Sequence, residues 1–420
     1  MRKIFIHLPA YREPELIPTI KSALDNAEFP ERLVFGICRQ YNPDDDFDNL
    51  DEYENNPQFK IYHLHYEKAK GLAYARAIIN EELLEDENFV LQLDSHHRFD
   101  THFDSRLIKW YDTLVEDGHN PLICGYLPYY DPFNDPDGRV KEPWWSEPAS
   151  FYPFGTIFIR PTAFKINWKE QTKPVPARFI SGHFCFGPNK WAKEIKHDTD
   201  IYFAGEELNL TIRSFTHGYD LFHPHEVIIW HATMRTERSG MLAWDDNHKR
   251  GEHGWVDQTD RARAKIRQLL GVEDNGFDMT GYDIGTVRTV RDYEKYAGIH
   301  FKKKSFQKYT KDNYPPPNPI IEDEKEWEDS FMYSFYHLVN ITIDMLPEKD
   351  YDSILVAFDD ENGIGIDSQI ITGHRLNQFL ENSKPIHFEK IFLTHQKPSR
   401  VVYWAHSKER GYAERYEEKL

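Results

Sequence analysis

The chain has 420 residues and a formal net charge of −19, from 51 Lys and Arg against 70 Asp and Glu. Its length suggests two or three domains, and its 40% hydrophobic and 15% aromatic content argues against global disorder. The negative charge opposes binding to nucleic acid or to an anionic lipid surface, since both depend on clustered Lys and Arg. No apolar run approaches the roughly 18–20 residues of a membrane helix, so we expect no membrane span.

The N-terminus and the cysteines indicate a reducing compartment. The segment MRKIFIHLPAYREPE does not read as a signal peptide, because its short apolar stretch carries His7 and runs into Pro9. The three cysteines form no CxxC pair: Cys38, Cys124 and Cys185. Neither a disulfide framework nor a thiolate zinc site is therefore expected, and we predict a cytoplasmic protein.

The first part of the chain alternates between strand and helix patterns. The sequence predicts strands at 3–8, 33–38, 59–64 and 89–94, and helices at 14–27 and 71–84. Such alternation argues for an α/β fold whose parallel sheet is covered on both faces. Ligands of open sheets of this kind bind beyond the carboxyl ends of the strands, so chemistry is expected just after Leu8, Cys38 and Leu93.

A break follows the α/β part of the chain. Helical patterns recur at 206–215 and 258–271, and the three consecutive prolines within 314–319 favour a semi-rigid connector. Runs of β-branched and aromatic residues beyond it predict strands. The predicted organisation is an α/β domain at 1–313, a linker at 314–322 and a small β-sandwich-like accessory domain at 323–420. Trp327, Tyr403 and Trp404 are candidates for stacking on sugars, with core packing as the alternative.

The triplet Asp94-Ser95-His96 ends the strand that begins at Phe89. In extended backbone, positions i and i+2 point the same way, so Asp94 and His96 can converge on one cation. A carboxylate with an imidazole suits Mn²⁺, Zn²⁺ or Fe²⁺ better than Ca²⁺. The alternative is that Asp94 caps a turn and His96 is an ordinary polar residue, because chance pairs are expected among 21 histidines.

His231 is the candidate for a third metal ligand. It follows the apolar residues 227–230, which read as a buried strand, and it leaves that strand at its carboxyl end. An Asp/His/His set with open positions also resembles the facial triad of iron oxygenases, which stays an alternative.

Two further segments offer polar groups at helix starts. Glu206 and Glu207 begin a helix, where its dipole stabilises carboxylates, and one of them is expected to accept hydrogen bonds from substrate hydroxyls. The alternative is plain first-turn stabilisation. Gly71 opens another helix that carries Arg76, an arrangement that can meet a phosphate. Arg235, in the polar segment after His231, can also reach a phosphate, with an ordinary exposed loop as the alternative.

In chain order, the segments that carry a resemblance are HLPAYRE, CRQYN, KGLAYAR, LQLDSHHRF, FISGHFCFG, DIYFAGEEL, HGYDLFHPHEVIIWH and GTVRTVRDYEKYAGIHF. Together they resemble the N-acetylglucosaminyltransferases that modify hydroxyproline, which are cytoplasmic enzymes with a GT-A fold. The resemblance covers residues 1–305. The chain is more distantly similar to the polypeptide N-acetylgalactosaminyltransferases, which also use a DxH metal motif. The resemblance implies a GT-A domain, and the small β-rich domain expected after it from the strand patterns is not part of the catalytic core of that family.

The resemblance implies a role for each candidate residue. Asp94 and His96 would be the DxH pair that holds Mn²⁺, with Mg²⁺ as the alternative, against the diphosphate of a UDP-sugar, and His231 would be the third ligand. The remaining contacts would be Pro9, Tyr11, Arg12 and Arg39 at the uridine, Gly71 and Arg76 beside the nucleotide, Ser95 near its ribose, and Gly182 and His183 beside the sugar. Glu206 or Glu207 would bind the sugar hydroxyls.

The expected activity is a Mn²⁺-dependent, retaining transfer of a sugar, N-acetylglucosamine first, from a UDP-sugar to an acceptor hydroxyl on a protein (hydroxyproline-like) or a glycan. No carboxylate is clearly placed as a covalent nucleophile, so front-face attack by the acceptor is the hypothesis we prefer. The alternatives are UDP-GalNAc or UDP-glucose as donor, a nucleotide- or carbohydrate-binding protein without turnover, and an unrelated Asp/His/His metalloenzyme.

Overall fold

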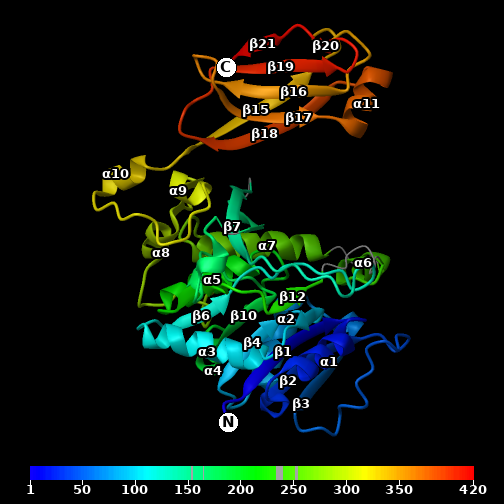
Figure 1. The fold of residues 1–420 in the computed structure, drawn as a ribbon, viewed down its shortest axis with the longest axis vertical. Helices are drawn as coiled ribbons and strands as arrows, with labels where there is room; N and C mark the ends of the chain where they lie inside the picture. The colour runs from blue at the N-terminus through cyan, green and yellow to red at the C-terminus, as the bar shows by residue number, and fades with distance from the viewer. Residues whose placement is uncertain (153–154, 164, 233–239, 251–253) are drawn as a thin grey trace. The chain divides into compact units, whose positions relative to one another are not determined.

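The computed structural model describes residues 1–152, 155–163, 165–232, 240–250 and 254–420 (Figure 1). Its compact units are Met1–Lys302 with Tyr309–Ile320, called unit 1, and Lys303–Lys308 with Ile321–Leu420, called unit 2. The proline-rich segment belongs to unit 1, where Asn318 is buried and accepts a hydrogen bond from Arg178 at 2.9 Å. The domain limits expected from the sequence stay a prediction.

Unit 1 is built on a mixed eight-stranded sheet with the order β3-β2-β1-β4-β10-β6-β11-β9. The strands are β1 (Ile4–Tyr11), β2 (Leu33–Tyr41), β3 (Phe59–His65), β4 (Phe89–Leu93), β6 (Pro121–Cys124), β9 (Val175–Pro176), β10 (Phe184–Pro188) and β11 (Asp220–His223). Strands β1 to β4 run parallel, whereas β10 runs antiparallel to both of its neighbours. The expected α/β fold with a largely parallel sheet is confirmed.

Helices cover both faces of this sheet. They are α1 (Leu16–Asn26), α2 (Leu72–Ile78), α3 (Phe103–Glu116), α4 (Asn189–Glu194) and α5 (Glu206–Thr216). Successive strand residues point to opposite faces, so Ile4 and Ile6 of β1 pack in one core with α1 and α3. Phe5 packs in the other core with α2, α4 and α5. The two covered faces leave the carboxyl edge of the parallel strands for ligands.

The first strand and the second helix differ from their predicted limits. Strand β1 continues through Pro9 to Tyr11. Strand β4 pairs with it only as far as His7, so β1 has an open edge beyond that residue. A proline, which lacks the backbone N–H, is tolerated at such an open edge. The expected helix over 71–84 is α2, followed by a π-helical turn at Ile79–Leu83.

Unit 1 has further strands and α-helices outside the eight-stranded sheet. They are β5 (His97–Phe99), β7 (Trp144–Phe151), β8 (Ile157–Ala163), β12 (Ile229–His231), α6 (Ala243–Lys249), α7 (Gly254–Leu269), α8 (Val290–Ala297) and β13 (Ile299–His300), with α9 (Lys308–Lys311) where the two units meet in the sequence. Strands β7 and β8 form a hairpin. A fully buried ion pair anchors it, because Arg178 donates to both carboxylate oxygens of Glu147 at 3.0 and 2.8 Å and to the carbonyl of Ala297.

Unit 2 is rich in strands. Its elements are β14 (Ser305–Phe306), α10 (Glu324–Asp329), β15 (Tyr333–Ile341), β16 (Ser353–Asp359), β17 (Gly365–Ile371), α11 (Gly373–Asn382), β18 (Ile386–Thr394), β19 (Arg400–Ser407), β20 (Gly411–Tyr412) and β21 (Tyr416–Lys419). A two-stranded and a five-stranded sheet share one core with α11, which includes Val339, Phe358 and Phe379. Tyr403 and Trp327 are buried, so they pack in the interior rather than stack on a sugar.

Candidate active site

Strand pairing brings distant segments to the carboxyl edge of β4. Residue Phe184 of β10 pairs with Leu93, and the antiparallel direction places Gly182 and His183 at the end of β4 where Asp94 follows. Strand β12 pairs with β5 so that His231 lies opposite His97. The sheet edge thus gathers residues that are more than a hundred positions apart in the chain.

Three side chains meet at this edge as a candidate metal site. One ligand atom each from Asp94, His96 and His231 lies within 4.8 Å of the others. The two Nε2 atoms of the histidines are 3.0 Å apart. Asp94 Oδ2 lies 3.4 Å from the Nε2 of His231 and 3.9 Å from that of His96. One carboxylate oxygen and two imidazole nitrogens that converge in this way suit a divalent transition metal.

Glu13 orients one of these ligands. Its Oε2 lies 2.9 Å from Nδ1 of His96, and the carboxylate is buried and also accepts the backbone N–H of Glu15. When Nδ1 carries the proton and donates a hydrogen bond to Glu13, the lone pair of Nε2 points toward the cluster. Metal-binding histidines are usually oriented by a carboxylate in this way. Sequence reasoning missed Glu13, although its place at the end of β1 was a signal.

Arg76 joins Asp94 to the rest of the site. The guanidinium is fully buried and donates from Nη2 to Asp94 Oδ1 at 2.8 Å and to the carbonyl of Gly182 at 2.7 Å, and from Nη1 to the carbonyl of Leu93. Its Nε lies 2.9 Å from Glu206 Oε1, an ion pair without hydrogen-bond alignment. Burial alone would raise the pKa of Asp94, but the hydrogen bond from His231 and the charge of Arg76 hold it well below its usual value.

The carboxylates of Glu206 and Glu207 open α5 beside Gly182. Glu207 accepts hydrogen bonds from the hydroxyl of Ser181 at 3.2 Å and from the backbone N–H of Gly182 at 3.3 Å. Burial raises the pKa of Glu206 to about 7, although the charge of Arg76 opposes the shift. Burial also raises the pKa of Glu207, against the two hydrogen bonds it accepts. Both expected sugar-binding carboxylates therefore lie close to the metal-ligand cluster.

Gly182 and His183 complete this end of the site. The ring of His183 stacks on that of His231, with centroids 4.3 Å apart, and its nitrogens contact the Ser181 hydroxyl and the Leu127 backbone N–H. Burial holds the pKa of His183 well below its usual value, so the ring is neutral. The neutral ring of His183 therefore packs against His231 without adding charge to the site.

Gly71 and Ser95 lie near the same edge. Gly71 has a φ of +100°, and a Cβ there would come within 2.6 Å of the carbonyl oxygen of Tyr202, so this position requires glycine. Ser95 is buried directly after Asp94, and its carbonyl accepts a hydrogen bond from Thr19. The backbone of both residues, in its conformation at Gly71 and in its hydrogen bond at Ser95, therefore shapes this edge.

The residues expected at the uridine are engaged with aspartates. Arg12 has a φ of 45° and its guanidinium pairs with Asp45 at 2.7 Å and with Asp246 of α6 at 2.9 Å. The hydroxyl of Tyr11 donates to the same oxygen of Asp246 at 2.9 Å. Sequence reasoning missed Asp246, because no periodicity relates α6 to β1.

Three more residues are predicted to contact the nucleotide: Arg39, Pro9 and Arg235. Arg39 pairs with the buried Asp48 at 2.7 Å, and Pro9 is buried within β1. Arg235 lies outside the residues that the structure describes.

A cavity of about 710 Å³ contains the metal-ligand cluster. The described residues that line it include Arg76, Asp94, His96, Gly182, His183, Glu206, Glu207 and His231. None of Pro9, Tyr11, Arg12 and Arg39 is among the described residues that line it. The structure thus brings together the expected metal and sugar residues, while the expected uridine residues lie outside this cavity.

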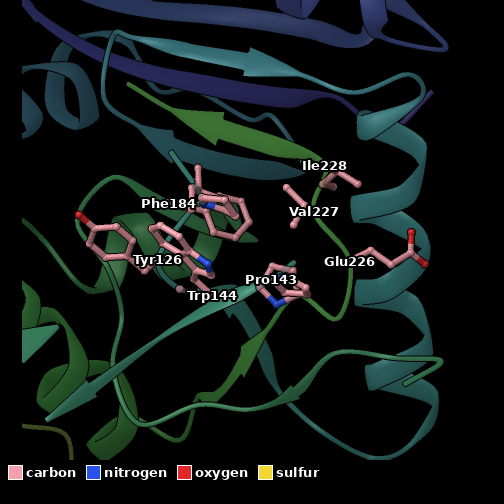
Figure 2. A pocket seen from close by; sticks show the side chains of 11 residues that line it. Tyr126, Pro143, Trp144, Phe184, Glu226, Val227 and Ile228 are labelled. Atoms are coloured by element: carbon pink, nitrogen blue, oxygen red, sulfur yellow. The ribbon is translucent and has the colours of Figure 1, made fainter. Parts of the chain in front are cut away.

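A second hollow beside it is too small for a substrate. Figure 2 shows this crevice, which Tyr126, Trp144, Phe184 and Val227 help to line. Its volume is about 10 Å³, which is roughly the space of one water molecule. The cavity of about 710 Å³ is the candidate active site, because it contains the metal-ligand cluster. Among the described residues, no helix has the length and apolarity to cross a membrane.

Comparisons with known proteins bear on what this site does. A family model described as glycosyltransferase (GlcNAc) matches residues 3–61 and 47–303. No curated protein matches the chain.

Similar solved structures share little sequence with the chain. A GalNAc-T7 structure with UDP, GalNAc and Mn²⁺ is 10% identical at a TM-score of 0.47 and covers 96% of this chain and 70% of that chain. TarS from S. aureus is 12% identical at a TM-score of 0.39, with 100% and 85% covered. Its 1–349 fragment in complex with UDP is 11% identical at a TM-score of 0.36, with 64% and 78% covered. Since the family model matches well over half of the residues, the chain belongs to the GlcNAc glycosyltransferase family, is a glycosyltransferase, and has the GT-A fold class expected for it.

Proposed function

We propose that the protein is a Mn²⁺-dependent, retaining glycosyltransferase that moves a sugar, N-acetylglucosamine first, from a UDP-sugar to an acceptor hydroxyl. The observation that carries the proposal is the convergence of Asp94, His96 and His231 in one cavity with Glu206 and Glu207, in a chain of the GlcNAc glycosyltransferase family. UDP-GalNAc and UDP-glucose are the alternative donors.

The donor set fits a divalent cation. Asp94 Oδ2 and the Nε2 atoms of His96 and His231 would hold it, with Glu13 and Arg76 orienting two of the ligands. Two imidazole nitrogens favour Mn²⁺ over Mg²⁺, which prefers oxygen ligands. When bound, the cation would offset the negative charge that develops on the departing diphosphate.

The residues of this chain would then position the sugar. Glu206 and Glu207 accept hydrogen bonds from its hydroxyls, while Gly182 and His183 border it. The acceptor oxygen forms a bond to the anomeric carbon as the bond from that carbon to the diphosphate oxygen breaks. The proton of the acceptor hydroxyl passes to a phosphate oxygen of the departing UDP. Attack from the face that the diphosphate leaves retains the anomeric configuration.

The nucleotide contacts and the compartment complete the proposal. Pro9, Tyr11, Arg12, Arg39, Gly71, Arg76 and Ser95 are proposed beside the nucleotide, and Arg235 at a phosphate. The acceptor is a hydroxyproline-like residue of a protein or a hydroxyl of a glycan. Cys38, Cys124 and Cys185 are free and buried, which supports a reducing, cytoplasmic location.

Release of UDP from a panel of UDP-sugars tests the proposal. The full chain is incubated with UDP-GlcNAc, UDP-GalNAc and UDP-glucose, with Mn²⁺ and with EDTA. We expect UDP release from UDP-GlcNAc above the other donors, and its loss with EDTA. Release that is insensitive to EDTA would contradict the metal dependence, and no UDP binding by calorimetry would contradict the function.

Replacing Glu206 with glutamine is expected to lower kcat/KM for transfer about 10- to 150-fold. A hydrogen bond to a charged group contributes about 1.5–3 kcal/mol, and loss of that contribution corresponds to this range, because about 1.4 kcal/mol is tenfold. The affinity for UDP should change less than twofold, because the carboxylate is proposed to contact the sugar and not the nucleotide. Steady-state kinetics and calorimetry with UDP measure the two effects.

The pH dependence separates this role from a structural one. The pKa of Glu206 is about 7, so the accepting carboxylate forms as the pH rises through neutrality and transfer should rise with it. In Glu206→Gln that rise should disappear, whereas Glu116→Gln, at an exposed position on α3, should keep it. Equal loss of UDP binding and transfer would show that Glu206 is misassigned.

A further inference from the structure

The mouth of the catalytic cavity carries exposed aromatic rings. Tyr152, Phe158, Phe203 and Trp244 all line it, with 39%, 44%, 53% and 37% of their surfaces exposed. They come from separate parts of the chain: the β7–β8 hairpin, the segment before α5, and α6. Large apolar side chains left in water around a cavity are typical of a ligand site.

These rings form two pairs. The centroids of Tyr152 and Phe158 are 5.8 Å apart with an angle of 63° between the planes, and those of Phe203 and Trp244 are 6.4 Å apart at 67°. In an edge-to-face pair the edge of one ring covers one face of the other, and the opposite face of that ring is left uncovered by the pair. Each pair can therefore offer a ring face to a ligand in the cavity.

The described lining of the cavity combines two kinds of side chain. Asp94, Glu206 and Glu207 form a charged group with Arg76, which contacts Asp94 and Glu206. The rest of the lining includes the four exposed rings and the aliphatic residues Ile157, Ile159, Pro161 and Leu242. The charged group, where a cation would be held, suits the nucleoside diphosphate. The rings and aliphatic side chains suit an uncharged ligand with a flat apolar face.

We propose that Tyr152, Phe158, Phe203 and Trp244 form the acceptor-binding subsite and that the acceptor is a carbohydrate. The C–H face of a sugar ring lies against the aromatic rings, and one of its hydroxyls points toward Glu206 and Glu207. The C–H face of a sugar ring needs no hydrogen-bond partner and matches the ring faces and aliphatic side chains of this lining, and binding of a peptide instead is an outcome of the test. The assignment of this ligand as the acceptor rests on the proposed function, but sugar binding itself does not.

Saturation-transfer NMR on the full, metal-free chain tests sugar binding directly. The probes are chitobiose, cellobiose, N-acetyllactosamine, maltotriose and a hydroxyproline peptide. We expect saturation of at least one oligosaccharide, and a tenfold or greater rise of its Kd in Phe158→Ala and in Trp244→Ala. Phe133→Ala is the matched control, because Phe133 is 52% exposed and is not among the residues that line the cavity. Its Kd should stay within twofold.

The outcomes separate this inference from the proposed function. The affinity for UDP with Mn²⁺, measured by calorimetry, should be unchanged in Phe158→Ala and Trp244→Ala, and an unchanged Tm shows that each variant is folded. If Trp244→Ala lowers the Tm, the result rests on Phe158→Ala alone. Saturation of the peptide alone, of no probe, or of sugars equally in all variants overturns the proposal. Sugar binding without any UDP binding would support this site and contradict the proposed function.

Discussion

Replacing Asp94 with alanine is expected to abolish the proposed metal-dependent binding of UDP and to lower transfer by on the order of 10²–10³-fold or more. Asp94 supplies the carboxylate of the candidate Asp/His/His cluster, and its Oδ2 lies within 4 Å of both histidine nitrogens. Without it, two neutral imidazoles would have to hold a dication. Their affinity would be too low to keep a cation beside the diphosphate, so the charge of the departing UDP would not be offset.

Calorimetry with UDP, in the presence of Mn²⁺ and of EDTA, measures this effect. Asp100→Ala is the matched control, because Asp100 lies shortly after Asp94 in the chain but pairs with Arg106 and is partly exposed. The control should bind UDP as the parent protein does. If Asp94→Ala keeps the Mn²⁺-dependent affinity, the metal site lies elsewhere.

The metal-ligand candidates could be predicted from the sequence, because local geometry places them. Asp94 and His96 are two residues apart at the end of an apolar strand, and His231 follows another. Both patterns are visible in the sequence without knowledge of the pairing. The carboxyl edge of β4 places Asp94 and His96, whereas the antiparallel pairing of β12 with β5 brings His231 to them, and no sequence pattern sets that pairing.

The partners of these residues could not be predicted, because they depend on long-range pairing. The antiparallel direction of β10 brings Gly182 next to Arg76, and no local pattern sets that direction. The contact of Asp246 with Tyr11 joins residues 235 positions apart. The aromatic rings at the mouth likewise come from separate segments of the chain, and no local pattern relates these segments to one another. Register and side-chain contact, rather than periodicity, decide these features.

Replacing Arg76 with methionine is expected to lower the free energy of unfolding by about 3–5 kcal/mol, since it leaves buried carboxylates without their cation. Methionine fills much of the same space, so the loss of charge dominates over the loss of packing. The matched control is Arg2→Met, whose pair with Asp112 is about half exposed on both sides. An exposed pair contributes at most about 1 kcal/mol. Urea unfolding of both variants measures the difference.

The pH dependence of that loss identifies its cause. The charge of Arg76 lowers the pKa of Asp94 and of Glu206 in the folded protein, so its removal raises both. A carboxyl whose pKa is higher in the folded than in the unfolded state binds more protons when folded, so stability falls as the pH rises between the two values. The folded pKa of Glu206 is about 7, above its usual 4.5, so its contribution to stability already falls between these two pH values. In the variant the folded pKa is higher still, and this pH range extends upward. The destabilisation by Arg76→Met should therefore be larger at pH 8 than at pH 5. An equal loss at both values would mean that Arg76 acts through packing and not through its charge.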